Sequence, residues 1–293
     1  MKFISEQIMQ EERIMRHLSC LVFSLALFGL MQAPAFGQPK KKNSKDLPKK
    51  VEPPRPTFKH LDGRNIVFVV DGAGNGSVAN EHLGELNVER QLGLIIRSVP
   101  WCRHNGVFED LVDVEAQTHA AVMLARSVAT IRKDAPNSHI FFVAHSVGAH
   151  VALMAAERSP PKSVDRVILL HAAISCTYDL TLALKNTRMG IDNFWSSEDA
   201  ILDAMVQHKS TADGRKVPAA GRVGFQLASR DKKDIEAYRA VRQYRWSEEY
   251  AGSGGHLAWI LCHNMKKVLV PMFFCPPPEL PPVIIKPKMP GAK

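Results

Sequence analysis

A single serine, Ser146, stands between a short apolar run at 139–143 and a segment at 147–157 whose apolar residues recur at helical spacing. On a sharp strand-to-helix turn, a serine side chain is exposed above the sheet, where a base can take its proton. The residues two before and two after it must be small, because the turn brings their backbones close to neighbouring strands, and Ala144 and Gly148 meet this need. The pattern predicts a nucleophilic serine, with a helix-capping serine on an ordinary turn as the alternative.

A second turn rich in glycine, DGAGNGS at 71–77, follows an apolar run at 66–70. A dinucleotide site would need a third glycine where Ser77 stands, and an acidic residue after the next strand, which instead closes on Pro100-Trp101. A phosphate loop would need a Gly-Lys-Ser/Thr sequence that is not there. We therefore expect no cofactor. The turn either uses glycine for positive φ or directs backbone N–H groups into a site beyond the strand ends.

With these two turns, the chain resembles the α/β-hydrolase superfamily, in its serine esterase and lipase branch, over roughly residues 60 to 275. The resemblance implies that Ser146 is the nucleophile of a triad ordered Ser, then Asp or Glu, then His. Asp71 stands where lipases of this branch carry a histidine, which leaves open which loop amide points inward. The resemblance also implies an oxyanion hole of backbone N–H groups, with these candidates: Gly72, Ala73, Gly74 and Val147.

His256 is the expected general base. It lies in the segment 251–259, AGSGGHLAW, whose flexible glycines would deliver the imidazole to the site just before an expected closing helix at 257–268. Of the 12 histidines, it alone combines a late position with such a loop, and an ordinary exposed loop histidine is the alternative. Three others are expected to pack near the serine turn or to fall on the closing helix: His145, His150 and His263.

The acid is expected at Asp199, which ends the segment 191–199 and comes one strand and one helix after the apolar run at 167–170, where the family places its acid. A carboxylate there would orient the imidazole and stabilise its charged form. Asp231, which follows an expected strand at 223–227, is the main rival. Three further residues remain open, although each could be a surface cap or an ion-pair residue: Asp179, Asp234 and Glu198.

Continuous apolar runs alternate with amphipathic segments through the middle of the chain. Strands are expected at 66–70, 94–96, 139–143, 167–170 and 223–227, and helices at 114–131, 147–157, 180–184, 235–242 and 257–268. This alternation predicts an α/β fold class, a mostly parallel sheet with helices on both faces. The 57 residues from Asp199 to His256 exceed one helix–strand unit, so we interpret part of them as an insertion, either a partial lid or a surface excursion.

The charge is unevenly distributed. The chain has a formal net charge of +9, but residues 58–275 hold 25 basic and 23 acidic side chains. A nucleic-acid-binding protein would concentrate basic residues on a folded face, so we expect no nucleic-acid partner. The composition, 45% apolar and 23% charged, fits one globular domain, which we place at 58–275. No CxxC or HExxH spacing occurs, so no metal site is expected.

The two ends are expected to lie outside this domain. Residues 1–37 read as a signal peptide, because basic residues precede a 13-residue apolar core and a small-residue exit, and Met15 is an alternative start. Residues 38–57 form a basic linker rich in Lys and Pro, and 276–293 a Pro-rich tail. An exported protein, periplasmic or secreted, permits disulfides among its cysteines, although their spacing fixes no pairing.

The sequence thus predicts an exported serine hydrolase that cleaves a small-molecule or lipid ester through a covalent acyl-enzyme. The linker would add peripheral contact with an anionic membrane or wall polymer. The alternative is a non-catalytic protein of the same fold that binds a wall or lipid component, because fold alone does not fix function.

Overall fold

The structure, a computed structural model, describes residues 57–274 apart from 75, 104–105 and 227–231. The expected signal peptide, the start at Met15, the linker up to Pro56, the C-terminal tail and Cys275 lie outside the described residues. Within the described part of the chain, no helix has both the length and the apolar character needed to span a bilayer.

A six-stranded sheet with the strand order β2-β1-β3-β4-β5-β6 forms the centre of the domain, and every neighbouring pair is parallel. The predicted α/β class is confirmed. Because all strands run the same way, their carboxyl ends meet at one edge of the sheet, where ligands bind in such folds. The strands are β1 (Asn65–Val70), β2 (Ile95–Ser98), β3 (His139–His145), β4 (Arg166–Leu170), β5 (Ile191–Trp195) and β6 (Val241–Arg245).

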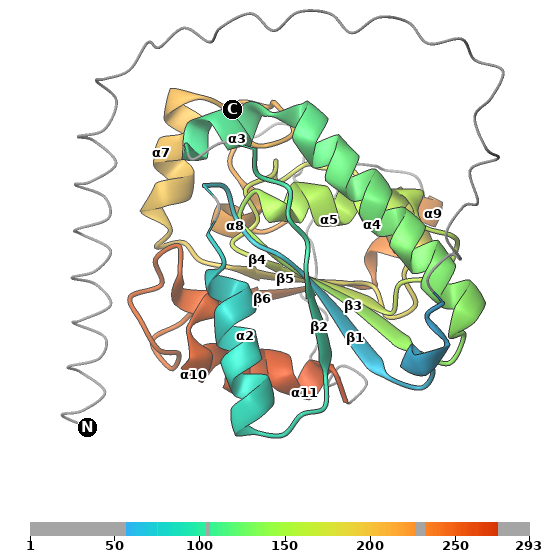
Figure 1. The fold of residues 1–293 in the computed structure, drawn as a ribbon. Coiled ribbons are helices and arrows are strands. Elements are labelled where there is room, and N and C mark those ends of the chain that lie inside the picture. The colour runs from blue at the N-terminus through green and yellow to red at the C-terminus, as the bar shows by residue number, and fades with distance from the viewer. Residues whose placement is uncertain (1–56, 75, 104–105, 227–231, 275–293) are drawn as a thin grey trace, which may run out of the picture. The chain divides into compact units, whose positions relative to one another are not determined.

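Helices cover both faces of the sheet, as predicted (Figure 1). In β1, alternate residues enter the two cores, with Phe68 facing one and Val67 and Val69 the other, which is why the strand reads as an unbroken apolar run. The larger helices are α2 (Val78–Glu89), α4 (Val114–Asp134), α5 (Gly148–Arg158) and α7 (Ala200–His208). The shorter ones are α3 (Val107–Val112), α6 (Thr181–Asn186), α8 (Ala220–Val223) and α9 (Lys232–Tyr238).

The strand expected at 223–227 is wrong for residues 223–226, and Leu227 lies outside the described residues. Val223 ends α8, and the backbone of Phe225 is bound by the Gln243 side chain, whose Nε2 donates to the Phe225 carbonyl at 3.0 Å. The helix expected at 235–242 is α9, which ends at Tyr238, and the last strand is β6. The arginines of β6 give its sequence a pattern that resembles an amphipathic helix. It is an edge strand, and its Arg242 pairs with the buried Asp192 of β5 at 2.7 Å.

The closing helix expected at 257–268 is broken near its start. A 3₁₀ turn, η2 (Ala258–Ile260), is followed by an extended residue, Leu261, before helical structure resumes. The Asn264 side chain donates to the carbonyl of Ala258 at 2.8 Å and accepts from the N–H of Ala251 at 2.8 Å, which folds the segment back on itself. The resumed helical segment consists of α10 (Cys262–Asn264), a π turn, η3 (Met265–Leu269), and α11 (Val270–Met272).

The stretch from Asp199 to His256 includes β6, which belongs to the sheet itself. This part is therefore not an insertion, and an insertion near the site remains a prediction only for the residues between α7 and β6.

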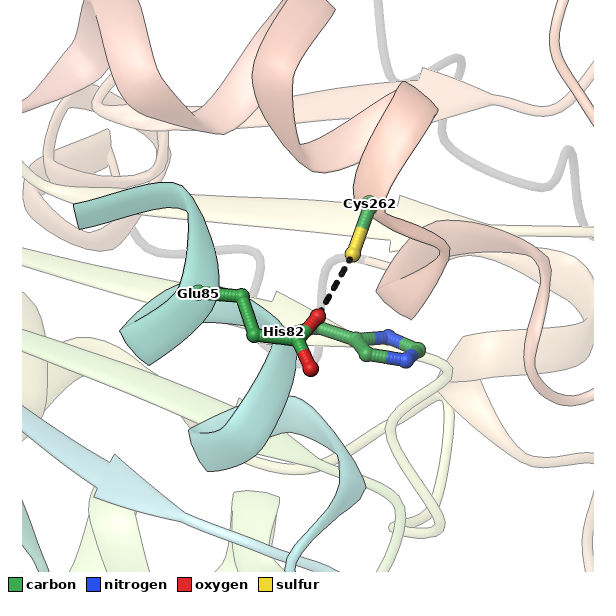
Figure 2. Close-up of side chains that lie close together, drawn as sticks. All are labelled: His82, Glu85 and Cys262. Carbon is green, nitrogen blue, oxygen red and sulfur yellow. Dashed lines mark hydrogen bonds between the residues drawn. The ribbon is translucent and has the colours of Figure 1, made fainter. Parts of the chain in front are cut away.

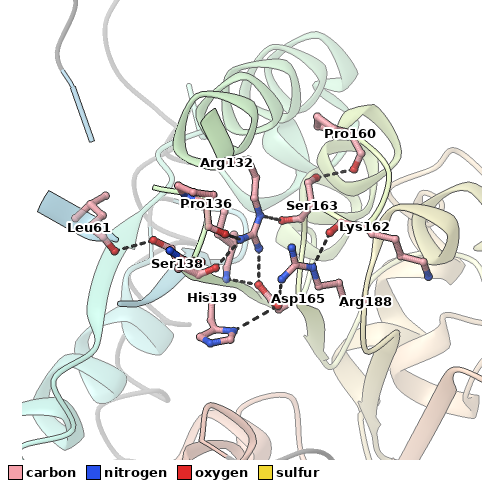
Figure 3. A network of polar contacts seen from close by, with 12 residues as sticks. Leu61, Arg132, Pro136, Ser138, His139, Pro160, Lys162, Ser163, Asp165 and Arg188 are labelled. Atoms are coloured by element: carbon pink, nitrogen blue, oxygen red, sulfur yellow. Dashed lines mark hydrogen bonds and ion pairs between the residues drawn. The ribbon is translucent and has the colours of Figure 1, made fainter. Parts of the chain in front are cut away.

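An ion-pair network around Asp165 joins helices and strands at the amino edge of the sheet (Figure 3). The carboxylate accepts from Arg132 Nη2 at 2.5 Å and from the N–H of Ile140 at 2.7 Å, and Arg188 Nη1 lies 3.3 Å away. His139 Nδ1 is 3.6 Å from the same group. Asp165 thus ties α4, β3 and β4 together at the end of the sheet opposite the carboxyl edge.

Candidate active site

Ser146 lies on a sharp turn between β3 and α5. Its φ is +53°, a left-handed conformation that is rare for a residue with a side chain and typical of a strained nucleophile turn. Gly148 is required two residues later, because a Cβ there would lie 2.2 Å from the carbonyl oxygen of Val70 on the neighbouring strand β1. The Ser146 N–H donates to the carbonyl of Leu170 in β4 at 3.0 Å. Both strands that flank β3, β1 and β4, therefore contact the turn.

Ser146, His256 and Asp199 form a continuous chain of hydrogen bonds. His256 Nδ1 lies 2.8 Å from Asp199 Oδ2, and its Nε2 lies 2.9 Å from Ser146 Oγ. Because an ionised carboxylate only accepts, the imidazole proton is on Nδ1, and Nε2 is free to accept the serine proton. The structure brings together the three residues that the sequence suggested as nucleophile, acid and base.

Asp199 is fully buried at the start of α7, and both of its oxygens are used. Oδ1 accepts the N–H of Leu202 at 3.1 Å and caps the helix. Oδ2 faces two imidazoles, His256 Nδ1 and His171 Nδ1, each at 2.8 Å. Burial alone would raise the pKa of Asp199, but the two histidines outweigh this and hold its pKa well below the usual range. Asp199 is therefore ionised at neutral pH.

A second histidine fixes the backbone of the base. His145 Nε2 donates to the carbonyl of His256 at 3.0 Å, since a carbonyl can only accept. Burial, together with the nearby His256, lowers the pKa of His145 to about 3, so this ring is neutral at physiological pH. His145 thus packs and hydrogen-bonds beside the serine, as the sequence suggested.

The loop after β1 lies next to the serine turn, because a Cβ on Gly72 would be 3.2 Å from the Ser146 Cβ. Asp71, for which the resemblance implied a histidine, holds this loop: its carboxylate accepts the N–H groups of Ala79 and Asn80 at 2.8 and 3.1 Å. Burial raises the pKa of Asp71 to about 6. Its carbonyl accepts Trp101 Nε1 at 2.8 Å.

The candidate N–H groups of the oxyanion hole differ in whether they already donate to an acceptor. The Gly74 N–H donates to Asp110 Oδ2 at 2.9 Å, so this donor already has a strong acceptor. Among the contacts of the described residues, none occupies the N–H groups of Gly72, Ala73 or Val147. These three remain available for a developing negative charge near the serine.

The other suggested acids lie elsewhere. Asp179 accepts the N–H of Thr181 at 2.9 Å on the surface, and Glu198 contacts the exposed Ser197 hydroxyl at 2.8 Å. Asp231 and the side chain of Asp234 lie outside the described residues. His150 is buried on α5 against Gln117, and His263 is exposed on α10.

Among the described residues, two groups of side chains combine ligand types that metals accept. One is His171, Asp199 and His256, whose nitrogen and oxygen atoms are already joined in the contacts above. The other is His82 and Glu85 of α2 with Cys262 of α10 (Figure 2). In that group the Cys262 thiol lies 3.7 Å from Glu85 Oε2, and His82 Nδ1 donates to the carbonyl of Ile260 at 2.6 Å. These contacts connect α2 to the segment that follows His256.

Sequence reasoning overlooked His171. It directly follows the strand at 166–170, and a polar residue at the carboxyl end of a parallel strand is itself a signal for a site residue. No sequence motif surrounds His171, so the motifs did not indicate it as a site residue.

No protein-family model and no curated protein matches this sequence. Solved structures with a similar fold include a predicted CIB-like hydrolase from Thermoplasma acidophilum, at 14% identity and a TM-score of 0.39, covering 72% of this chain and 86% of that one. The catalytic core domain of an acetyl xylan esterase from Trichoderma reesei is 12% identical, with a TM-score of 0.40 and coverages of 73% and 98%. LpqC, a poly(3-hydroxybutyrate) depolymerase from Bordetella parapertussis, is 14% identical, with a TM-score of 0.43 and coverages of 73% and 79%. Similarity of this degree concerns the fold alone.

Proposed function

We propose that this protein is a serine hydrolase that cleaves carboxylic esters through a covalent acyl-enzyme. The observation that carries the proposal is the pair of hydrogen bonds linking Ser146 Oγ to His256 and His256 to Asp199, at 2.9 and 2.8 Å. A nucleophile, a base and an orienting acid in this relation make up the machinery of acyl transfer. The left-handed Ser146 turn gives further support.

The first half of the reaction forms the acyl-enzyme. His256 Nε2 accepts the hydroxyl proton of Ser146 while Oγ bonds to the ester carbonyl carbon and the carbonyl electron pair moves onto oxygen. When this intermediate collapses, the bond to the leaving alcohol breaks and His256 returns the proton to that alcohol. Asp199 stays ionised throughout and stabilises the imidazolium that forms in between.

The second half releases the acid. Water loses a proton to His256 and attacks the acyl carbon, and the bond to Ser146 Oγ breaks as the serine regains the proton. In both halves the N–H groups of Val147 and of Gly72 or Ala73 would hold the negative oxygen. One such donor is worth about 10²–10³ in rate.

The proposal includes export and a small-molecule or lipid ester as substrate. Export is supported by the charged start and 13-residue apolar core of residues 1–37. The basic linker at 38–57 would then give electrostatic contact with an anionic membrane or wall polymer.

Hydrolysis of a p-nitrophenyl ester by the wild-type protein and by Ser146→Ala tests this function. We expect kcat/KM to fall at least about 10³-fold in the variant, because the triad acts as a unit. Ser127→Ala, which removes an exposed hydroxyl on α4, is the matched control and should keep full activity. Equal rates for wild type and Ser146→Ala would show that the assignment is wrong.

A further inference from the structure

The acid of the proposed triad has more partners than a triad needs. Asp199 Oδ2 is hydrogen-bonded to His256 Nδ1 at 2.8 Å and also lies 2.8 Å from His171 Nδ1, a close polar contact whose N–H is not aligned for a hydrogen bond. His171 is completely buried at the carboxyl end of β4 and cannot reach substrate. Its ring centre lies 5.5 Å from that of His256, so the two imidazoles flank one carboxylate oxygen.

The surroundings determine which nitrogen of His171 carries the proton. The backbone N–H of Trp259 donates to His171 Nε2 at 3.3 Å, so Nε2 has no proton of its own. The single proton of a neutral ring is then on Nδ1, the atom that faces Asp199. Burial lowers the pKa of His171, which keeps the ring neutral.

The backbone of His171 is held firmly in an uncommon conformation. Its φ is +50°, a left-handed value that costs a residue with a side chain about 1 kcal/mol or more. Its N–H donates to the carbonyl of Phe194 at 2.9 Å. A Cβ on Gly221 would lie 2.3 Å from the His171 carbonyl carbon, so α8 packs directly on this turn. These contacts fix the His171 backbone and so the direction of its side chain, which a positioning role requires.

From this geometry we propose that His171 is a positioning residue, a neutral ring whose Nδ1 edge lies against the Asp199 carboxylate, keeps it turned toward His256 and anchors the histidine loop through Trp259. The inference rests on the proposed function. His171 joins three parts of the chain: the end of β4, the start of α7 and the turn η2, whose Trp259 comes three residues after His256. Without this contact, the carboxylate would keep its helix cap but lose the side chain that limits its rotation.

The contact between His171 and Asp199 also affects the pH dependence that we expect of the site. Four titratable groups face one another here, the proposed acid and three histidines: Asp199, His145, His171 and His256. Removing the His171 N–H leaves the carboxylate less stabilised, so Asp199 takes up a proton more readily. This effect moves the acidic limb of probe labelling to higher pH.

Two substitutions separate the two contacts of His171. Asn places an amide N–H near the position of Nδ1, and Gln places its amide near that of Nε2. The rate of phosphonylation by a fluorophosphonate probe, followed against pH in the full chain, needs no knowledge of the substrate. We expect His171→Gln to slow labelling about tenfold and to move the acidic limb upward, and His171→Asn to stay within about threefold of wild type.

Circular dichroism melts show which variants are folded, and His139→Gln, on a histidine of the distant Asp165 network, is the matched control. Equal rates and coincident pH profiles for the Gln and Asn variants would overturn the role of His171. If neither variant folds, nitrogen NMR of the wild-type rings decides: a proton on His171 Nδ1 supports the inference, and a proton on Nε2 or on both nitrogens contradicts it. A wild-type protein that is never labelled would refute the proposed function. The NMR result would still test the role of His171, because it reports the protonated nitrogen without any reaction.

Discussion

At the scale of single residues, Asp199 would combine a structural task with the chemical one that the proposed function assigns to it. Its Oδ1 caps α7 by accepting the N–H of Leu202, and its Oδ2 accepts the Nδ1–H of His256. The two tasks use different oxygens, so a substitution can separate them. Asn caps helices as well as Asp does, but its NH₂ group cannot accept the Nδ1 proton of His256.

Asp199→Asn should therefore leave the free energy of unfolding within about 1 kcal/mol of wild type while lowering kcat about 10³–10⁴-fold. The physical reason is that the imidazole would turn to the wrong tautomer. Ester hydrolysis and chemical denaturation of the same preparation measure both quantities. A fully active Asp199→Asn would mean that the acid lies elsewhere.

The residues of the proposed triad are predictable from the sequence where a motif surrounds them. Ser146 was found from the strand and helix on either side, and His256 from its late glycine loop. Asp199 could be ranked but not separated from Asp231, because only the folded chain shows which carboxylate reaches the imidazole. His171 has no motif, since its contact depends on the turn conformation at the end of β4.

At the scale of elements, the serine turn depends on how closely α5 approaches β1. A Cβ on Gly148 would lie 2.2 Å from the carbonyl oxygen of Val70 and 2.5 Å from that of Asp71. Neither backbone group can move without disturbing the sheet and the loop that follows it. The same element boundary was predictable from the sequence, since a small residue is needed there.

Gly148→Ala should lower the free energy of unfolding by about 2–3 kcal/mol, because the methyl group overpacks the helix–strand contact. Gly84→Ala is the matched control: this glycine lies in α2 with nothing within 4 Å of an added Cβ. The control should raise the free energy of unfolding by about 0.5–1 kcal/mol through helix propensity. Urea denaturation measures both, and changes of the same sign would contradict the packing account.

Elements were harder to predict at the carboxyl end of the domain than at the start. Strands β1, β3 and β4 are buried on both faces and read as continuous apolar runs. Edge strand β6 mixes Arg242 and Arg245 with apolar residues, so its pattern does not separate it from an exposed helix. Its pairing with β5 places Arg242 against the buried Asp192, a partner 50 residues away in the sequence.

At the scale of the whole molecule, buried neutral histidines link stability to pH. His150 lies on α5 with its Nδ1 2.7 Å from Gln117 Oε1, and burial lowers its pKa from 6.5 to about 4. Between these two values the unfolded chain binds more protons than the folded one. The free energy of unfolding therefore falls as the pH is lowered from 6.5 to about 4.

His150→Asn should remove this part of the pH dependence, because Asn can donate to Gln117 but does not titrate. We expect the loss of stability between pH 6.5 and 4 to be smaller in the variant by about 2–3 kcal/mol. The difference between the two curves isolates His150 from groups that act in the opposite sense, such as Asp71. Parallel curves for the two proteins would show that His150 is not responsible.

The central claim is that Ser146 is an activated nucleophile, and intact mass after treatment with a fluorophosphonate probe tests it most directly. The account predicts one adduct per folded molecule, absent from Ser146→Ala and retained in Ser127→Ala. An adduct that persists in Ser146→Ala, or folded wild-type protein that takes up no probe, would contradict it. The second result would favour a non-catalytic binding protein built on this fold.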